Sequence, residues 1–402
     1  MKKFNYRAMK SDGNKIEGIH EANTRDEVVE MITSNGYYPL KIEEIAGGKE
    51  IGSLNLNNKV TTKDLAVFCR QMFTMLNAGV SITNALEMME AQCTSKKLKM
   101  ILGEICEDVK KGKMFSECMR NYPKDFPKLL VSMVQSGEAT GNMDEIMLRM
   151  ATHFEKENKI NNKVKSAMIY PVVLAIVAVI AIMAIMIFVM PTFRQIFDSE
   201  DLVMPGITVA LLAVSDFMRE NIVIILIVIA GLVVGINMFR KTAKGYDFFS
   251  RFKLKLPVIG DLNRKIITSR FTRTMSTLLS SGISLIEALP IVTEVLGNKV
   301  AEEEMNSIRE KVVKGEGLSE PIRMATVFPE MLSSMIKIGE ESGSLDDILN
   351  KTADFYDEEV DQAITTATSL IEPALIIVMG GAIGVLVIAI MLPMFDMYQQ
   401  MS

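Results

Sequence analysis

The sequence predicts a mainly α-helical membrane protein with two repeated cytoplasmic helical-bundle modules, three transmembrane helices and a small N-terminal α/β module. Three observations predict this fold class. Three apolar runs are long enough to cross a bilayer as helices, the second half of the chain repeats much of the first, and the rest is rich in charge. Hydrophobic residues make up 49% and charged residues 23% of the 402 residues. This mixture suits soluble modules joined to a few spans.

The first 48 residues predict the α/β module. Two short strands are expected at FNYRAM and KIEGIHEA, joined by a turn at residues 11–14. A helix over 24–35 is followed by a third strand over 38–44. Residues 49–61, a polar and asparagine-rich run that contains Gly52 and follows Gly47 and Gly48, are typical of a linker. Because the basic start of the chain has no apolar run behind it, we expect no signal peptide and a cytoplasmic N-terminus.

Three apolar runs, at residues 169–190, 222–239 and 371–392, are the predicted transmembrane helices. At 1.5 Å per residue, the two longer runs reach about 33 Å and the shorter one about 27 Å, close to the hydrocarbon thickness of a bilayer. A buried helix of a soluble protein is sometimes this apolar, but rarely three times in one chain. The interiors of the three runs contain no ionisable residue, and Glu372 lies only at the inner edge of the third.

Lysine and arginine near the span ends predict the direction of each span. Basic residues gather before the first span (Lys156, Lys159, Lys163, Lys165) and after the second (Arg240, Lys241, Lys244, Arg251, Lys253, Lys255). The loop between them, residues 191–221, has more acidic than basic residues. We therefore expect this loop to be extracytoplasmic and both basic flanks to be cytoplasmic. The third span then runs outward and leaves the tail, residues 393–402, outside.

An internal repeat relates the two halves of the chain. Phe68–Leu86 reads FCRQMFTMLNAGVSITNAL, and Phe271–Leu289 reads FTRTMSTLLSSGISLIEAL, an offset of 203 residues from 68 to 271. A later stretch, FPKLLVSMVQSGEATGNMDEI from residue 126, matches FPEMLSSMIKIGEESGSLDDI from residue 328, at an offset of 202. One gap over so long a register indicates duplication. The unrepeated second span returns the chain to the cytoplasm, so that both copies have the same topology.

Each copy predicts a bundle of six short helices, in the cytoplasmic domains at residues 62–168 and 240–370. In the first copy, Ser81 is the expected N-cap of the second helix. A later helix, which Pro127 begins, is expected to end at Gly137. The last helix of the bundle is expected to continue towards the membrane.

The sharpest local motif is a glycine–glutamate pattern, GEATG in the first copy and GEESG in the second. Its candidate residues are Gly137, Glu138, Gly141, Gly339, Glu340 and Gly343. In one interpretation the motif forms a helix–turn–helix, in which the glycines permit positive φ and the threonine or serine caps a helix. In the other, the two glutamates present carboxylates to a partner protein or hold the hairpin of the bundle.

Two GxxxG patterns lie inside predicted spans, Gly231 with Gly235 and Gly380 with Gly384. Small residues let the backbones of membrane helices approach closely. These four glycines are therefore candidates for helix packing, either within the chain or in a homo-oligomer.

No catalytic, cofactor or metal site is predicted. The four cysteines match no zinc or thioredoxin spacing, and two histidines, His20 and His153, are too few for a metal cluster or a catalytic triad. The chain has no GxxxxGK[ST] motif with which to cradle the phosphates of ATP. A net charge of −5 does not favour nucleic-acid binding.

Four features together carry a resemblance to a known family: LNAGVS and LSSGIS at 76–81 and 279–284, the GEATG and GEESG pair, Tyr170-Pro171 with Glu372-Pro373, and the N-terminal YRAM…GYYPL segment. In these features, and over essentially its whole length, the chain resembles the platform proteins of the type II secretion system F and type IV pilus assembly protein C family.

The resemblance implies a non-enzymatic, multi-pass, homo-oligomeric protein of the cell inner (plasma) membrane. Its expected partners are a separate cytoplasmic hexameric assembly ATPase, pilin or pseudopilin subunits, other inner-membrane assembly proteins and the lipid bilayer. The main alternative is a transporter or permease subunit, which predicts charged or broken helices near the middle of the membrane. A membrane-bound enzyme or receptor would instead need a polar cluster in a module. The sequence shows neither feature.

Overall fold

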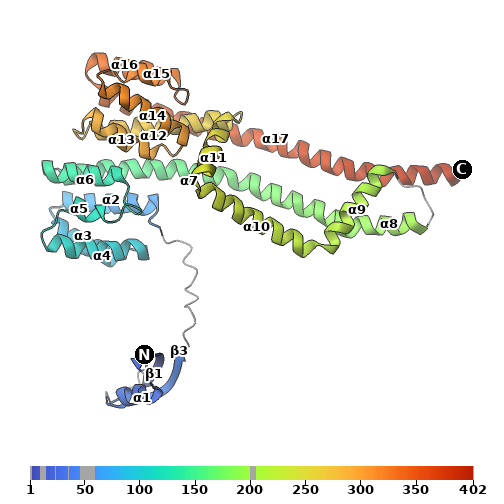
Figure 1. Cartoon of the computed structure of the whole chain (residues 1–402), viewed down its shortest axis with the longest axis horizontal. Helices are drawn as coiled ribbons and strands as arrows, with labels where there is room; N and C mark the ends of the chain where they lie inside the picture. Colours follow the sequence, from blue (N-terminus) through green and yellow to red (C-terminus); the bar gives the residue numbers. More distant parts are fainter. Residues whose placement is uncertain are drawn as a thin grey trace. The chain divides into compact units, whose positions relative to one another are not determined.

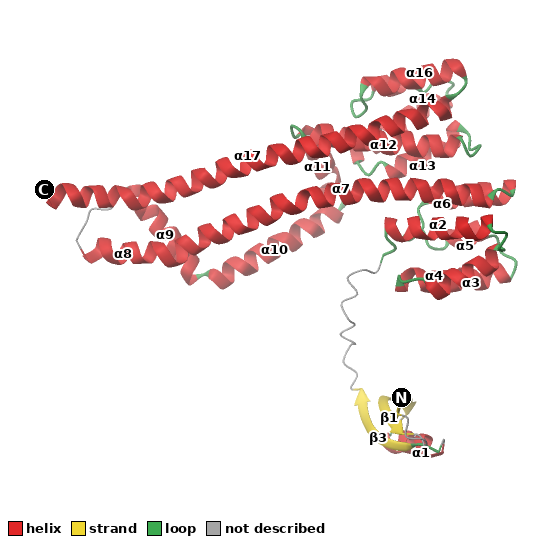
Figure 2. Ribbon diagram, turned by 180° about the vertical axis from the view of Figure 1, so that it is seen from behind, coloured by secondary structure: helices red, strands yellow, loops and turns green. Residues whose placement is uncertain are grey.

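The computed structural model describes residues 2–9, 15–22, 24–34, 36–45, 59–199 and 205–401. Over these residues the fold is mainly helical, as the sequence predicts, and three helices are long and apolar enough to cross a membrane (Figures 1 and 2). The chain divides into two compact units, Met1–Asn58 and Lys59–Ser402.

The first unit is a three-stranded antiparallel sheet with one helix, which confirms the predicted α/β module. Its elements are β1 (Lys2–Met9), β2 (Lys15–Ala22), α1 (Arg25–Ser34) and β3 (Tyr38–Ile45), and the strand order is β2-β1-β3. Val28 and Ile32 of α1 are buried together with Ala8 and Ala22 of the sheet. The predicted turn at 11–14 and most of the predicted linker lie outside the described residues.

Six helices form the first repeated module. They are α2 (Thr62–Asn77), α3 (Ile82–Gln92), α4 (Lys96–Lys110), α5 (Phe115–Arg120), α6 (Lys128–Thr140) and α7 (Met143–Ala184). The predicted number is correct, although the last helix is not short. Ser81 caps α3 as predicted, because its hydroxyl accepts a hydrogen bond from the Asn84 N–H at 3.4 Å.

The second module repeats this order. Its helices are α12 (Ile259–Leu279), α13 (Leu285–Val295), α14 (Lys299–Val313), α15 (Ser319–Met324), α16 (Glu330–Ser342) and α17 (Leu345–Met401). Ser284 caps α13 at the position that Ser81 has in the first copy, and it forms a capping box with Glu287.

The last helix of each module continues without a break into a candidate membrane span (Figure 1). In the first copy, α7 continues through a π-helical turn, η1 (Ile185–Val189), into α8 (Met190–Ser199). In the second copy, α17 alone has 57 residues, which gives a length of about 85 Å. The spans predicted at 169–190 and 371–392 lie inside these long helices.

Three helices connect the modules: α9 (Gly206–Glu220), α10 (Ile222–Lys241) and α11 (Ala243–Lys255). The described part of the expected loop, 191–199 and 205–221, is therefore largely helical. Charge alone had suggested a loop there, but α9 also carries an apolar face that buries Leu212 beside the long helices. The second span corresponds to α10, whose apolar window is not buried by the rest of the chain, as expected for a helix that faces lipid.

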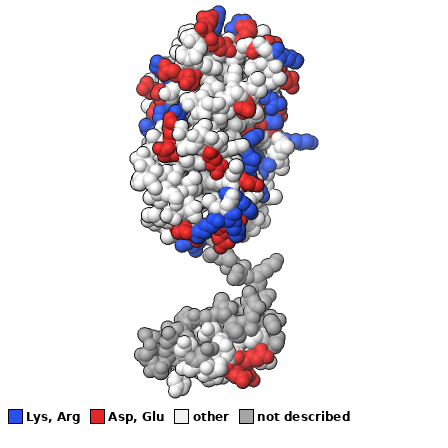
Figure 3. Space-filling view, turned by 90° about the vertical axis from the view of Figure 1, so that its left-hand side faces the viewer, with Lys and Arg blue, Asp and Glu red and all other residues white. Residues whose placement is uncertain are grey.

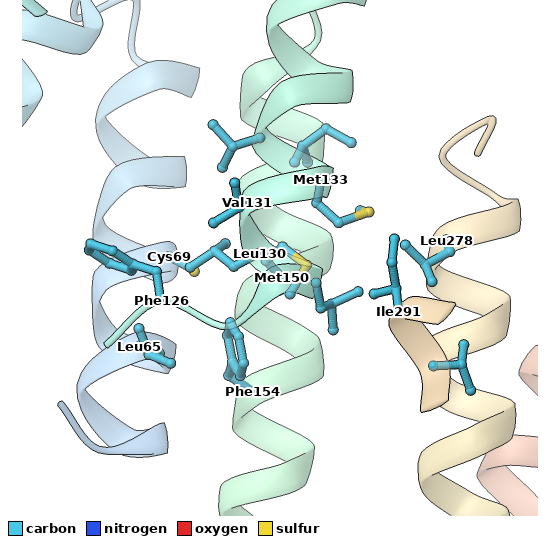
Figure 4. Close-up of a cluster of buried hydrophobic side chains, with 14 of the residues drawn as sticks. Leu65, Cys69, Phe126, Leu130, Val131, Met133, Met150, Phe154, Leu278 and Ile291 are labelled. Carbon is cyan, nitrogen blue, oxygen red and sulfur yellow. The ribbon is translucent and has the colours of Figure 1, made fainter. Parts of the chain in front are cut away.

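One contiguous hydrophobic core runs through both modules (Figure 4). It includes Leu65 of α2, Met150 of α7, Leu278 of α12 and Ile291 of α13, all buried. Because these side chains come from both copies of the repeat, the two modules share one core and pack as a single body.

Candidate functional site

The helical hairpin α6–α7 contains the first copy of the glycine–glutamate motif. Gly137 lies inside α6, and a Cβ built on it would come within 3.0 Å of Ile146 Cγ1 and 3.3 Å of the Met143 Cα. A side chain at this position would therefore push the two helices apart. Gly141 ends α6 in the left-handed region, at φ 79°, where glycine has no steric penalty.

Glu138 points back into the module and caps the short helix α5. Its carboxylate accepts hydrogen bonds from the Phe115 N–H at 2.6 Å, from the Ser116 N–H at 3.2 Å and from the Ser116 hydroxyl. The N-terminus of a helix leaves such N–H groups without intrahelical partners, and a negative charge there is favourable. Glu138 thus binds α5 to the α6–α7 hairpin.

The second copy repeats this arrangement. A Cβ on Gly339 would lie 2.9 Å from the Leu345 Cα, and Gly343 ends α16 at φ 69°. The Glu340 carboxylate accepts hydrogen bonds from the Leu318 N–H and, at 3.3 Å, from the Ser319 N–H at the start of α15. Both motifs therefore place their glutamate on the short helix of their own module.

Two expectations about the motif are wrong in detail. The helix expected to end at Gly137 continues to Thr140, because a close helix contact rather than a turn requires glycine there. The Thr140 hydroxyl donates to the Ser136 carbonyl and the Ser342 hydroxyl to the Ile338 carbonyl, so neither residue caps a following helix. Both instead bond back one turn within their own helix.

A repeated ion pair joins the first helix of each module to its long helix. In the first copy, the Arg70 guanidinium donates from Nε and Nη2 to the two oxygens of Glu155, at 2.8 and 2.6 Å. In the second copy, Arg273 and Asp357 occupy the equivalent positions and lie 2.6 Å apart. The Arg70 guanidinium lowers the pKa of the Glu155 carboxyl through this hydrogen bond.

Ion pairs also connect the two modules across the junction of α7 and α17. Lys156 and Lys163 of α7 pair with Asp354 and Asp361 of α17. Asp354 binds Arg273 as well, at 2.7 Å, so this carboxylate bridges both modules. Elsewhere, the Ser136 hydroxyl of α6 donates to the Ser281 carbonyl, 3.2 Å away, at the end of α12.

A small polar cavity lies at the same junction, with a volume of about 30 Å³. Its wall includes His153 of α7 and Arg273 and Thr274 of α12. His153 Nδ1, Arg273 Nε and Thr274 Oγ1 are buried and have no hydrogen-bond partner in the described part of the chain. Burial, with Arg273 and Arg270 nearby, lowers the pKa of His153 to about 4, so the imidazole is neutral. The cavity has the size and polarity to hold a water molecule.

At the ends of the long helices that lie far from the modules, α9 binds both of them. Proline removes the hydrogen bond to a carbonyl one turn earlier, and Pro393 in this way frees the carbonyl of Ala389. The buried Thr208 hydroxyl donates to that carbonyl at 2.7 Å. In the other helix, the Ser215 hydroxyl donates to the Met186 carbonyl in the π-turn before Pro191. Hydroxyl side chains are a known way to satisfy the backbone carbonyls that proline frees in membrane helices.

The GxxxG glycines lie in open positions among the residues that the structure describes. A Cβ built on Gly231, Gly235, Gly380 or Gly384 meets no atom within 4 Å. Close packing of these glycines within the chain is therefore not seen among the described residues, and helix packing through them stays a prediction.

Among the described residues, no group of three or more histidine, cysteine or acidic side chains is arranged to hold a metal ion. All four cysteines lie in the first module and are free thiols, and Cys69, Cys106 and Cys118 are buried. Burial raises the pKa of the Cys69 thiol, which makes it unreactive in the folded state.

Sequence reasoning identified the motif residues but missed the junction. Nothing in the sequence paired Lys156 with Asp354, because 198 residues separate them. The Arg70–Glu155 pair was within reach, since the repeat places an arginine and an acidic residue at equivalent positions in both copies.

Comparisons with known proteins agree with this architecture. The domain family described as "Type II secretion system (T2SS), protein F" matches twice, over residues 68–191 and 271–393. The corresponding N-terminal domain family matches residues 1–43. A type IV pilus assembly protein PilC of Thermus thermophilus is 36% identical over 402 residues, with 99% of each chain covered. A type II secretion system protein F of Xanthomonas campestris is 30% identical, with 98% of each chain covered.

Proposed function

The chain belongs to the type II secretion system protein F family, and on that premise we propose that it is the membrane platform protein of a type IV pilus or type II secretion machine. It is not itself an enzyme. It couples a separate cytoplasmic hexameric assembly ATPase to the insertion or removal of pilin or pseudopilin subunits. The names of its relatives, which include both pilus assembly and secretion proteins, support this role.

The proposed topology places the N-terminal unit and both helical modules, 62–168 and 240–370, in the cytoplasm. The three spans then cross the inner membrane, and 191–221 and the C-terminal tail lie outside. The basic residues that flank α7 and α10 support this direction.

The observation that carries the proposal is the continuity between module and span. A protein that transmits motion needs a continuous connection between its parts, and an α-helix without a break is one. Both outgoing helices begin inside a module and pass unbroken into the membrane. The ion pairs of Lys156 and Lys163 bind the two modules together at the base of these helices. A force applied to either module would therefore reach both spans.

The first test is biochemical. We expect the purified full chain, reconstituted in lipid nanodiscs, to bind the cognate assembly ATPase and to stimulate its ATP hydrolysis. Absence of both binding and stimulation contradicts the proposal, and substrate-dependent flux in liposomes would favour the transporter alternative. Deletion of the gene, with surface pili, secretion and DNA uptake scored separately, then identifies the machine.

A second test separates ATPase binding from force transmission. We expect the double variant Lys156→Ala/Lys163→Ala to keep ATPase binding but to lose much of the pilus assembly or secretion. A matched control is Lys351→Ala, which removes only an exposed pair with Asp347 on the same helix. Equal function of both variants contradicts transmission through the junction.

A third test maps the contact with pilin. A photo-crosslinking amino acid at Phe188 or Ile377, each 74% exposed in a span, is expected to capture pilin or pseudopilin subunits. The same group at Ala389, which is fully buried, is the control. Capture at neither exposed position would contradict subunit contact through these two helices.

A further inference from the structure

The helix α11 follows the second span after a tight, one-residue turn. A single residue, Thr242, separates α11 from α10. The Thr242 hydroxyl donates to the Phe239 carbonyl at 2.7 Å and accepts from the Gly245 N–H at 3.2 Å. A Cβ on Gly245 would lie 1.9 Å from the Phe239 carbonyl oxygen, so only glycine fits this corner. Because α10 is a span, α11 must start at the membrane boundary.

One face of α11 packs on the second module. The Tyr246 hydroxyl donates to Glu302 at 2.8 Å, and the Arg251 guanidinium donates to Glu303 at 3.0 Å. Ser250 is buried, and its hydroxyl accepts from the Lys299 N–H at 3.2 Å. In Figures 1 and 2, α11 runs crosswise to the long helices α7 and α17. Its axis therefore lies along the membrane surface rather than through the membrane.

Another face of α11 is aromatic and exposed. Phe248 is 58% exposed and Phe252 is 48% exposed, and their rings stack with centroids 6.1 Å apart. The exposed apolar surface continues past the end of α11 to Val258 and Ile259. Such a face on a helix at the boundary of a bilayer is typical of interfacial amphipathic helices.

Among the described residues, cations without a carboxylate partner lie at the end of α10 and along α11, and one of them, Arg240, lies over the Phe249 ring at 5.7 Å. Arg240, Lys241, Lys244, Lys253 and Lys255 form no ion pair with any carboxylate in the part of the chain that the structure describes. By contrast, Arg251 on the module side is paired with both Asp247 and Glu303. The cations without an ion pair lie at the end of α10 and along α11, at the depth where anionic headgroups would lie if α11 rests on the bilayer surface.

We propose that α11 binds anionic phospholipids, with Phe248 and Phe252 inserted among the acyl chains and the unpaired cations on the headgroups. This interaction sets the depth of the second module at the membrane surface. The identity of the leaflet, the cytoplasmic one, rests on the proposed topology.

The chain contains no tryptophan, so a single substitution supplies a unique fluorescent probe. We expect Phe248→Trp, in the full chain reconstituted into liposomes, to emit at short wavelength and to be quenched by lipids brominated near the headgroup. The second probe, Phe252→Trp, should behave alike. The matched control is Phe355→Trp, on an exposed position of α17 about 24 Å along the helix from the third span, which should emit at long wavelength without quenching.

Lipid selectivity is measured with spin-labelled phosphatidylglycerol against phosphatidylcholine. We expect the full chain to prefer phosphatidylglycerol and the triple variant Lys244→Gln/Lys253→Gln/Lys255→Gln to lose most of that preference, since each lysine near an anionic surface adds up to about fivefold. The control variant, with Lys96, Lys99 and Lys124 of the first module changed to glutamine, should keep it.

The proposal is overturned by water-exposed, unquenched tryptophan at both positions, or by equal selectivity in the two triple variants. Shielding of Phe248→Trp only after the assembly ATPase is added would also overturn it, in favour of a protein partner. No ATPase is needed for the lipid measurements, so their failure is distinguishable from failure of the proposed platform function.

Discussion

Removal of the Glu138 carboxylate should open α5 without unfolding the module. Glu138 accepts three hydrogen bonds from Phe115 and Ser116, both of which are buried, so water cannot easily replace them. A hydrogen bond to a charged group contributes about 1.5–3 kcal/mol, and orphaned buried donors cost about 1–3 kcal/mol. We therefore expect Glu138→Ala to lower the free energy of opening α5 by about 3 kcal/mol, and Glu138→Gln by about half as much.

The assay uses a cysteine that the chain already has. Cys118 lies on α5 and is buried, so it reacts with a thiol reagent only when α5 opens. A loss of 3 kcal/mol corresponds to a labelling rate at Cys118 on the order of 100-fold higher. The rate at each cysteine is read by peptide mass spectrometry on the full chain in nanodiscs. Cys69, buried on α2, serves as the internal reference and should not change.

Two controls make this prediction specific. Glu107→Gln removes an exposed carboxylate of the same module, whose pair with Lys111 is long at 4.0 Å, and it should leave Cys118 unchanged. Glu340→Ala opens α15 in the other module, which contains no cysteine, and it should also leave Cys118 unchanged. A Cys118 rate within about twofold of the parent chain in Glu138→Ala would refute the capping role. An equal rise at Cys69 would mean global rather than local opening.

Three further outcomes follow from the geometry. Gly137→Ala should lower the midpoint of thermal cysteine labelling more than Gly141→Ala does, because the first must displace the Met143 backbone whereas the second costs about 1 kcal/mol of strain. The pKa of His153 is about 4 in the fold and 6.5 ordinarily, so the contribution of the neutral imidazole to the free energy of unfolding is complete above pH 6.5 and falls by up to about 3 kcal/mol as the pH drops towards 4. His153→Gln should therefore reduce the pH dependence of the free energy of unfolding, as measured by chemical denaturation between pH 6.5 and 5. Thr208→Val removes the hydrogen bond from α9 to the Ala389 carbonyl and should increase spin-label mobility at the C-terminal end of α17. An unchanged spectrum would mean that this hydrogen bond does not hold the end of the helix.

The features that the sequence predicted correctly are those that depend on a local residue pattern or on the internal repeat. Apolar length predicted the spans, the register of the repeat predicted two equivalent modules, and Gly141 followed from the need for positive φ after a helix. The helix through Gly137 was mispredicted because a glycine in a sequence looks the same whether it serves a turn or a close contact. Only the position of Met143 across the hairpin decides between them.

The rest depends on contacts between distant residues. Glu138 meets α5 across 22 and 23 residues, and its direction into the module could not be read from the motif. His153 carries no distinguishing neighbours in the sequence, and its burial arises only when α7 of one copy packs against α12 of the other. The segment 191–221 was judged by charge alone, which concealed the apolar face of α9.

The prolines of the repeat show where the long helices can move. Pro171 and Pro191 in one helix, and Pro373 and Pro393 in the other, are each 20 residues apart, which is about 30 Å and matches the hydrocarbon layer. At the two prolines far from the modules, Pro191 and Pro393, hydroxyl groups of α9 donate hydrogen bonds to nearby backbone carbonyls and hold both helices. At the two prolines near the modules, Pro171 and Pro373, no such hydroxyl contact is found among the described residues. A groove of about 380 Å³ opens there between α7 and α17, beside Pro171. Since proline weakens a helix where it lies, bending should concentrate at the two prolines near the modules. Movement of the two packed modules would then tilt both spans together about the ends that α9 holds by hydrogen bonds.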